Sequence, residues 1–204
     1  MDIDKPNIID FIRTVPDYPT PGINFYDINS LFASGIFNTI IDNLAKQIKE
    51  QIQYPTHIAG VESRGFVIGS AIAYKLNIPF VMIRKENSKY PGNLHKQSYD
   101  LEYGSNTLVL QEGIIGHTGR IVLVDDLIAT GGSLLASQQL CESFGSKVIA
   151  NVALIDLKYI NTDEKKKLNN TIVYHTVEKW LTYYTKPGST EYPYQTVFRI
   201  TKEK

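Results

Sequence analysis

Cysteine, net charge and long apolar runs are what this sequence has least of. A single cysteine, Cys141, excludes an intrachain disulfide and a cysteine-rich zinc site. The 21 Lys and Arg residues balance 21 Asp and Glu residues, so no basic field favours nucleic acid or an anionic membrane. No apolar run approaches the roughly 18 residues of a membrane-spanning helix, and the N-terminus does not resemble a signal peptide. We therefore expect a cytoplasmic protein with neither nucleic acid nor membrane as a partner.

The composition that remains is that of a globular protein. The chain has 204 residues, of which 43% are hydrophobic, and this fits one domain with a core of ordinary size. Its N-terminal part predicts a short helix over 8–13, a stiff proline-rich loop over 16–22 and a core-covering amphipathic helix over 35–53. The lysine-rich segment 161–170 is polar, and we expect a solvated helix or loop there.

The most informative stretch is IVLVDDLIATGGS, residues 121–133. Its first four residues are continuously apolar, which is typical of a strand buried on both faces. Asp125 and Asp126 follow where we expect the strand to emerge, and ATGGS then leads into a predicted helix over 134–144. A second apolar run, Val148–Leu157, comes next. Strand, turn, helix and strand in this order predict a βαβ unit of a parallel sheet.

The ATGGS turn (residues 129–133) has the features of a phosphate site. Gly131 and Gly132 let the backbone approach a ligand, and the first amides of a helix favour an anion. Thr130 and Ser133 add hydroxyl donors. The preceding carboxylates would repel a bare phosphate, but they suit hydroxyl groups of a sugar. The stretch therefore predicts a site for a sugar phosphate; a plain polar loop is the alternative.

A second βαβ unit lies upstream. We expect a strand over 57–61, a turn over 62–65, a helix over 66–76 and a parallel strand over 79–84. Arg64 in the turn presents a planar fork of donors that suits phosphate oxygens, although a surface salt bridge would also explain it.

Basic residues follow that last strand. Arg84 and Lys85 leave it at the carboxyl end, where ligands bind in open α/β sheets. Residues 86–98 are polar, basic and punctuated by Pro and Gly, which predicts a long functional loop. A solvated basic hairpin is the alternative.

Five motifs in this order resemble those of the type I phosphoribosyltransferase family: PTPGINFYDI, GVESRGF, RKENSKYPG, SYDLEYG and VDDLIATGGS. The last is similar to the VDDLLATGGT form of the members that use adenine. The resemblance implies an α/β fold, with a mainly parallel, doubly wound sheet and a small hood contributed mainly by residues 1–34. The family domain would span 1–180, with 181–204 as a C-terminal extension of unknown role.

The activity that the resemblance implies is transfer of the phosphoribosyl group of phosphoribosyl diphosphate (PRPP) to adenine, which yields AMP and diphosphate for purine salvage. Mg²⁺ would be the cofactor, held mainly by PRPP, so we assign it no protein ligand. The partners would be these small substrates, and by analogy with relatives the chain would form a homodimer.

The resemblance also assigns roles to individual residues. Glu102 would be the general acid/base at the purine nitrogens. Phe25 would stack on adenine, main-chain groups of Asn24 and Tyr26 would read its edge, and Leu127 would also bind it. The PRPP and AMP contacts would come from Arg64, Arg84, Lys85, Lys89, Tyr103, Asp125, Asp126, Ala129, Thr130, Gly131, Gly132 and Ser133.

The resemblance implies a specific role for Asp125 and Asp126 and a specific geometry for one peptide bond, and the sequence departs from the family at two positions. Asp125 and Asp126 would hold the ribose hydroxyls and stabilise an oxocarbenium-like transition state. Glu62–Ser63 is where the family often has a cis peptide. Many relatives carry Arg where Tyr26 stands, and the RKENSKYPG segment is longer by one residue than its family counterpart.

Three alternatives remain open from the sequence. A phosphoribosyltransferase for a 6-oxopurine would share most motifs. A non-catalytic nucleotide-sensing protein could use the same fold. An acidic-pocket α/β protein, such as a receiver domain or an Mg²⁺ phosphatase, would use Asp125 and Asp126 as metal ligands, but this leaves the ATGGS, SRGF and RK segments unexplained.

Overall fold

The protein is described by a computed structural model that divides into two compact units. The first comprises residues 1–39 and 179–204, and the second comprises residues 40–178. The structure describes residues 6–18, 21, 25–88, 90–100 and 105–178.

The described part of the first unit is built around a small antiparallel sheet. Strand β1 (Arg13–Val15) pairs with β2 (Phe25–Asp27), and the ion pair between Arg13 and Asp27 joins their ends. A short 3-10 helix, η1 (Ile8–Phe11), precedes β1, and α1 (Asn29–Phe32) follows β2. The helix predicted over 8–13 is therefore present in a shorter form, which ends where β1 begins.

Helix α2 (Phe37–Gln51) begins in the first unit and continues into the second. Its buried residues recur at helical spacing, as the sequence predicts for 35–53. They are Ile40, Ile41, Leu44, Ala45 and Ile48.

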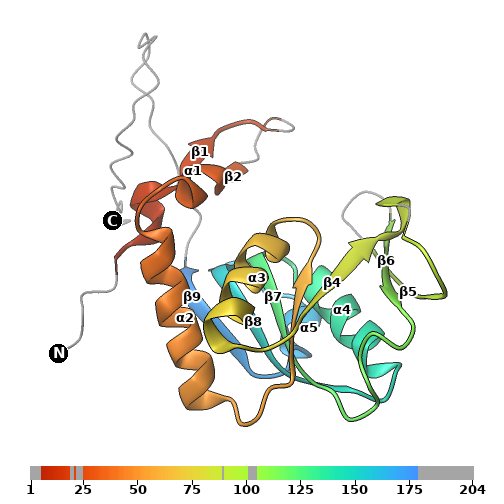
Figure 1. Cartoon of the computed structure of the whole chain (residues 1–204). Helices are drawn as coiled ribbons and strands as arrows, with labels where there is room; N and C mark the ends of the chain where they lie inside the picture. Colours follow the sequence, from red (N-terminus) through yellow and green to blue (C-terminus); the bar gives the residue numbers. More distant parts are fainter. Residues whose placement is uncertain (1–5, 19–20, 22–24, 89, 101–104, 179–204) are drawn as a thin grey trace, which may run out of the picture. The chain divides into compact units, whose positions relative to one another are not determined.

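The second unit is organised on a seven-stranded sheet with the order β5-β6-β4-β3-β7-β8-β9 (Figure 1). The strands from β4 to β9 in this order pair in parallel, and the β5–β6 hairpin adds an antiparallel edge. The strands are β3 (His57–Val61), β4 (Phe80–Lys85), β5 (Leu94–Asp100), β6 (Ser105–Gln111), β7 (Arg120–Ile128), β8 (Lys147–Leu157) and β9 (Thr171–Val177). The helical segments of this unit beyond α2 are α3 (Arg64–Leu76), η2 (Glu86–Ser88), α4 (Gly132–Glu142) and α5 (Asp163–Lys166). The predicted α/β class with a mainly parallel sheet is confirmed.

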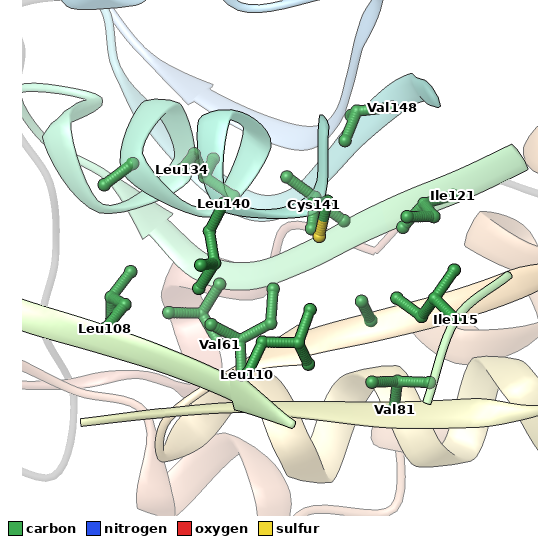
Figure 2. Packing of buried hydrophobic residues seen from close by; sticks show 14 of the residues in the cluster. Val61, Val81, Leu108, Leu110, Ile115, Ile121, Leu134, Leu140, Cys141 and Val148 are labelled. Carbon is green, nitrogen blue, oxygen red and sulfur yellow. The ribbon is translucent and has the colours of Figure 1, made fainter. Parts of the chain in front are cut away.

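One face of the sheet packs on α4. Figure 2 shows Leu134, Leu140 and Cys141 of that helix turned toward Val61 and Leu110 of the sheet. Cys141 is fully buried, which raises the pKa of its thiol to about 12, so it is a core residue as expected.

The opposite face approaches α3 closely, and glycines permit this. A Cβ on Gly65 would lie 2.5 Å from the carbonyl oxygen of Val124, and one on Gly60 would lie 2.6 Å from the carbonyl oxygen of Gly65. Because these distances leave no room for a side chain, the first turn of α3 rests directly on the backbones of β3 and β7.

Several boundaries differ from the sequence-based prediction, and three of these differences bear on the site. Strand β7 continues to Ile128, so the two aspartates lie within it; pairing with the long strand β8 extends the ladder past them. Helix α3 begins at Arg64 rather than Phe66. Part of the predicted loop over 86–98 is strand β5, which pairs residue by residue with β6, so the hairpin alternative describes that part better.

No helix among the described residues is long and apolar enough to cross a membrane.

Candidate functional site

The candidate site lies at the carboxyl edge of the parallel strands. The chain runs from β3 through α3 to β4 on one side, and from β7 through α4 to β8 on the other, while β3 and β7 are neighbours. Crossovers that diverge from adjacent strands make a topological switch point, where ligands bind in doubly wound sheets. The chain leaves the sheet there at Glu62 after β3 and at the ATGGS turn after β7.

The ATGGS turn connects β7 to α4. Gly131 adopts a left-handed conformation (φ 85°) just before the helix, which begins at Gly132. The hydroxyl of Thr130 accepts a hydrogen bond from the amide of Gly132 at 3.4 Å. The first-turn amides of a helix have no intrahelical acceptor, and the helix dipole makes this end positive. The turn can therefore bind a phosphate group by its backbone.

Asp125 and Asp126, here called the acid pair, lie in the second half of β7, near the ATGGS turn, and both are buried. Asp125 accepts hydrogen bonds from the Asp126 amide (2.9 Å) and from the Ser133 hydroxyl (3.2 Å). Burial, and then the neighbouring charge of Asp126, raise the pKa of Asp125 well above its usual value. The hydroxyl of Ser133 thus connects the acid pair to the ATGGS turn.

Arg64 meets this pair from the first turn of α3. Its Nε lies 3.0 Å from Oδ2 of Asp126. The two atoms form an ion pair. Oδ2 of Asp126 is nevertheless buried without a hydrogen-bond partner among the described residues, so the ion pair is not an aligned hydrogen bond. A buried acceptor in this condition is costly unless a donor reaches it, and a sugar hydroxyl is such a donor.

Glu62 organises the other cations of the site. Its Oε2 accepts a hydrogen bond from the Lys85 amide at 2.7 Å and lies 3.6 Å from Nε of Arg84. The guanidinium carbon of Arg84 also lies 5.1 Å from the ring centre of Tyr90, in cation–π contact. The peptide between Glu62 and Ser63 is cis, as predicted. Glu62 was not among the predicted site residues, because its partners lie more than twenty positions downstream.

The structure brings the predicted residues of the second unit to this one edge: Arg64, Arg84, Lys85, Asp125, Asp126, Leu127, Ala129, Thr130, Gly131, Gly132 and Ser133. Leu127 is half-buried near the end of β7. The predicted residues Asn24, Lys89, Glu102 and Tyr103 lie outside the described residues.

Two predicted adenine contacts belong to the first unit. Phe25 is half-buried and meets Tyr18 edge-on, with ring centres 5.2 Å apart. Tyr26 is only 8% exposed, so its side chain is buried. A buried side chain at this position is compatible with recognition of a base by the main chain.

Comparison with known proteins supports one family. The model of the phosphoribosyl transferase domain matches residues 27–193. An adenine phosphoribosyltransferase of Acidovorax sp. is 38% identical over 168 residues, which are 82% of this chain and 91% of that protein.

Solved structures agree. The crystal structure of adenine phosphoribosyltransferase from Thermoanaerobacter pseudethanolicus is similar with a TM-score of 0.77 and 35% identity, over 83% of this chain and 98% of that one. The enzyme from Saccharomyces cerevisiae, complexed with adenine and an iminoaltritol bisphosphate, has a TM-score of 0.75 and 31% identity, over 80% of this chain and 94% of that one. The chain therefore belongs to the phosphoribosyltransferase family and, within it, to the adenine phosphoribosyltransferases.

Proposed function

We propose that this chain transfers the 5-phosphoribosyl group of PRPP to adenine, with AMP and diphosphate as products. One observation carries the proposal: the order of groups along the sheet edge matches the order of groups in PRPP. The acid pair lies in β7 and the ATGGS turn follows it, whereas Arg64 follows β3 and Arg84 lies next to the end of β4. These strands are consecutive neighbours in the sheet. PRPP presents a 5′-phosphate, a ribose and a diphosphate in that sequence.

Each part of the site has a defined task in binding. The amides of the ATGGS turn and the Thr130 hydroxyl hold the 5′-phosphate. The acid pair accepts hydrogen bonds from the ribose hydroxyls, for which the unsatisfied Oδ2 of Asp126 is suited. Arg64, Arg84 and Lys85 bind the diphosphate, joined by Lys89 and Tyr103. A net charge of zero makes such a local gathering of cations necessary for a polyanionic substrate.

The reaction is a substitution at C1′ of the ribose. N9 of adenine forms a bond to C1′ while the C1′–O bond breaks, and its electron pair leaves with diphosphate. The ring proton that adenine loses passes to the carboxylate of Glu102. Positive charge that develops on the ribose is stabilised by the acid pair. Asn24, Phe25, Tyr26 and Leu127 hold the base.

Mg²⁺ is the cofactor of this proposal, and it neutralises the diphosphate leaving group when bound. The described residues fit a metal that is carried mainly by substrate. The oxygens of Asp125 already accept two hydrogen bonds, and Asp126 lies against Arg64.

We further propose that the enzyme is a cytoplasmic homodimer, as the sequence analysis expects. The names of the curated relatives support adenine as the base rather than a 6-oxopurine, and they are names of enzymes rather than of nucleotide sensors.

The proposal is tested by incubating the full chain with PRPP, Mg²⁺ and one base at a time: adenine, hypoxanthine, guanine or xanthine. We expect AMP as the main product, with kcat/KM for adenine at least about 100-fold above that for the other bases, because a site that hydrogen-bonds one base edge leaves polar groups unpaired with another. Preferential formation of IMP, GMP or XMP, or no nucleotide at all, contradicts the proposal.

A further inference from the structure

Helix α5 lies against the ATGGS turn, although the sequence predicts a solvated segment there. The hydroxyl of Thr162, the residue before α5, donates a hydrogen bond to the carbonyl oxygen of Thr130. A Cβ on Gly131 would lie 3.0 Å from Cγ of Lys165 and 3.2 Å from its amide nitrogen. The turn and α5 are therefore in direct contact, and a Cβ at Gly131 would fit only if Lys165 moved slightly.

Lys165 is partly buried, unlike the solvated lysine that its surroundings in the sequence suggest. Its side chain is 13% exposed, and its ammonium donates hydrogen bonds to Oδ1 of Asp156 and to the carbonyl oxygen of Leu157, both at 2.7 Å. The next lysine, Lys166, has a side chain 62% exposed and pairs with the solvent-facing Asp163. Thus α5 is fastened to the carboxyl end of β8 by Lys165.

The ion pair is largely shielded from water, since the two side chains are 13% and 19% exposed, and the mutual attraction offsets the lost hydration only when the geometry is good. Asp156 lies opposite Ile128, the last residue of β7, in the β7–β8 ladder. The pair therefore anchors α5 to the sheet at the position where the ATGGS turn begins.

We infer that Thr162 and Lys165 are positioning residues for the 5′-phosphate of the substrate, acting through the ATGGS turn; this rests on the proposed function. In a planar trans peptide the carbonyl and the following N–H point in opposite directions. Because Thr162 binds the Thr130 carbonyl on the α5 side, the amide of Gly131 is directed away from α5. Glycine at a left-handed φ could otherwise let this peptide rotate, which would turn a carbonyl dipole toward the phosphate.

The test compares two pairs of variants in the full chain. Thr162→Val removes the hydroxyl but keeps the branched shape, and Thr162→Ser keeps the hydroxyl. Lys165→Met removes the partly buried ammonium but keeps the methylene groups near Gly131, and Lys166→Met removes a solvent-exposed ammonium from the same helix. Calorimetry gives the Kd for AMP without turnover, and steady-state kinetics gives the KM values for PRPP and adenine.

We expect Thr162→Val to raise the Kd for AMP and the KM for PRPP about fivefold to tenfold, the effect of one lost hydrogen bond, with the KM for adenine within about twofold of wild type. Thr162→Ser and Lys166→Met should match wild type. Lys165→Met should act in the same direction as Thr162→Val. Since it leaves the partly buried Asp156 without its cation, the double variant Lys165→Met with Asp156→Asn is measured as well, with its Tm as a check of folding.

Equal changes in the KM values for PRPP and adenine, or an unchanged AMP affinity in both Thr162→Val and the folded double variant, overturn the inference. Failure of the proposed function looks different: the wild-type chain would bind AMP, with weaker binding in Thr162→Val, yet form no AMP from adenine and PRPP.

Discussion

Nε of Arg64 and Oδ2 of Asp126 lie 3.0 Å apart, so the cation that we assign to diphosphate and the acid that we assign to ribose are immediate neighbours. The contact exists because the first turn of α3 rests on β7, which the absence of a side chain at Gly65 allows. Binding of PRPP would insert ribose and diphosphate oxygens between two groups that now face each other. Each would exchange one polar partner for another without either charge being left unpaired.

The first prediction concerns Arg64. Replacing it with Gln should raise the KM for PRPP by about 10- to 100-fold, the effect of losing charge-assisted hydrogen bonds, and Arg64→Lys should restore only part of the affinity because it lacks the planar fork. Initial-rate kinetics with varied PRPP measures this. Arg120→Gln is the control, since Arg120 binds carbonyl groups of Gln53 and Tyr54 at the opposite end of the sheet. Equal effects of Arg64→Gln and Arg120→Gln on this KM would contradict the assignment.

Asp125 carries a prediction about pH and stability. Its pKa in the folded protein is raised above the usual 3.8 by burial and by Asp126. The folded state therefore keeps a proton that the unfolded state releases. The contribution of Asp125 to the free energy of unfolding is then fully present below the ordinary pKa of an aspartate, and it is lost as the pH rises through the raised pKa of Asp125. Removing the ionisable group should remove this loss.

We accordingly expect Asp125→Asn, measured without ligand, to have a higher Tm than wild type at pH 7.5, by about 2–4 °C for each kcal/mol recovered. The difference should shrink toward pH 4, and the same variant should bind PRPP more weakly. Scanning calorimetry across this pH range provides the test, with the exposed Asp42→Asn as control. A variant less stable than wild type at pH 7.5, or a difference independent of pH, argues against a raised pKa.

A third prediction separates two roles of Glu62. Glu62→Gln keeps an oxygen that can accept from the Lys85 amide, whereas Glu62→Ala removes both this acceptor and the partner of Arg84. We expect Glu62→Ala to raise the KM for PRPP about tenfold and Glu62→Gln to raise it less than about threefold. If the two variants have the same KM, the hydrogen bond to the Lys85 amide does not organise the cations.

Glu102 is assigned by resemblance, and kinetics can test the assignment directly. Glu102→Gln should lower kcat by about 10²- to 10⁴-fold, the usual contribution of general acid–base catalysis, with little change in the KM for PRPP. Glu112→Gln serves as the matched control because Glu112 pairs with Asn93 on the β5–β6 hairpin, in a solvent-exposed position. A kcat near that of wild type for Glu102→Gln would assign the proton transfer to another group.

The parts of this fold that could be predicted are those encoded in local pattern. Ile121–Val124 and His57–Val61 are continuously apolar, and both are strands buried in the parallel sheet. The glycines and hydroxyl residues of the ATGGS turn likewise mark the start of α4 in the sequence itself. These signals predict the α/β class and place the acid pair near the carboxyl end of β7, although the strand continues past it.

The rest depends on contacts between distant segments. Strand β5 is polar and only its pairing with β6 defines it, so a local pattern suggests a loop. Lys165 stands in a run of lysines, and nothing in that run distinguishes the one whose ammonium pairs with Asp156. Thr162 did offer a signal, because a threonine followed by Asp163 and Glu164 is typical of a helix start. That signal indicates the helix but not its contact with the ATGGS turn.

The last prediction returns to the approach of α3 to the sheet. Because a Cβ on Gly65 would lie 2.5 Å from the Val124 carbonyl oxygen, Gly65→Ala must push the first turn of α3 away from β7. We expect a loss of about 1–3 kcal/mol in the free energy of unfolding, as for other overpacked sites, and weaker PRPP binding because Arg64 moves with the helix. Urea titration and the KM for PRPP measure the two effects. Gly116→Ala is the control, since a Cβ there meets no atom within 4 Å. Should Gly65→Ala match Gly116→Ala in both measurements, the close approach of α3 does not position Arg64 for its substrate.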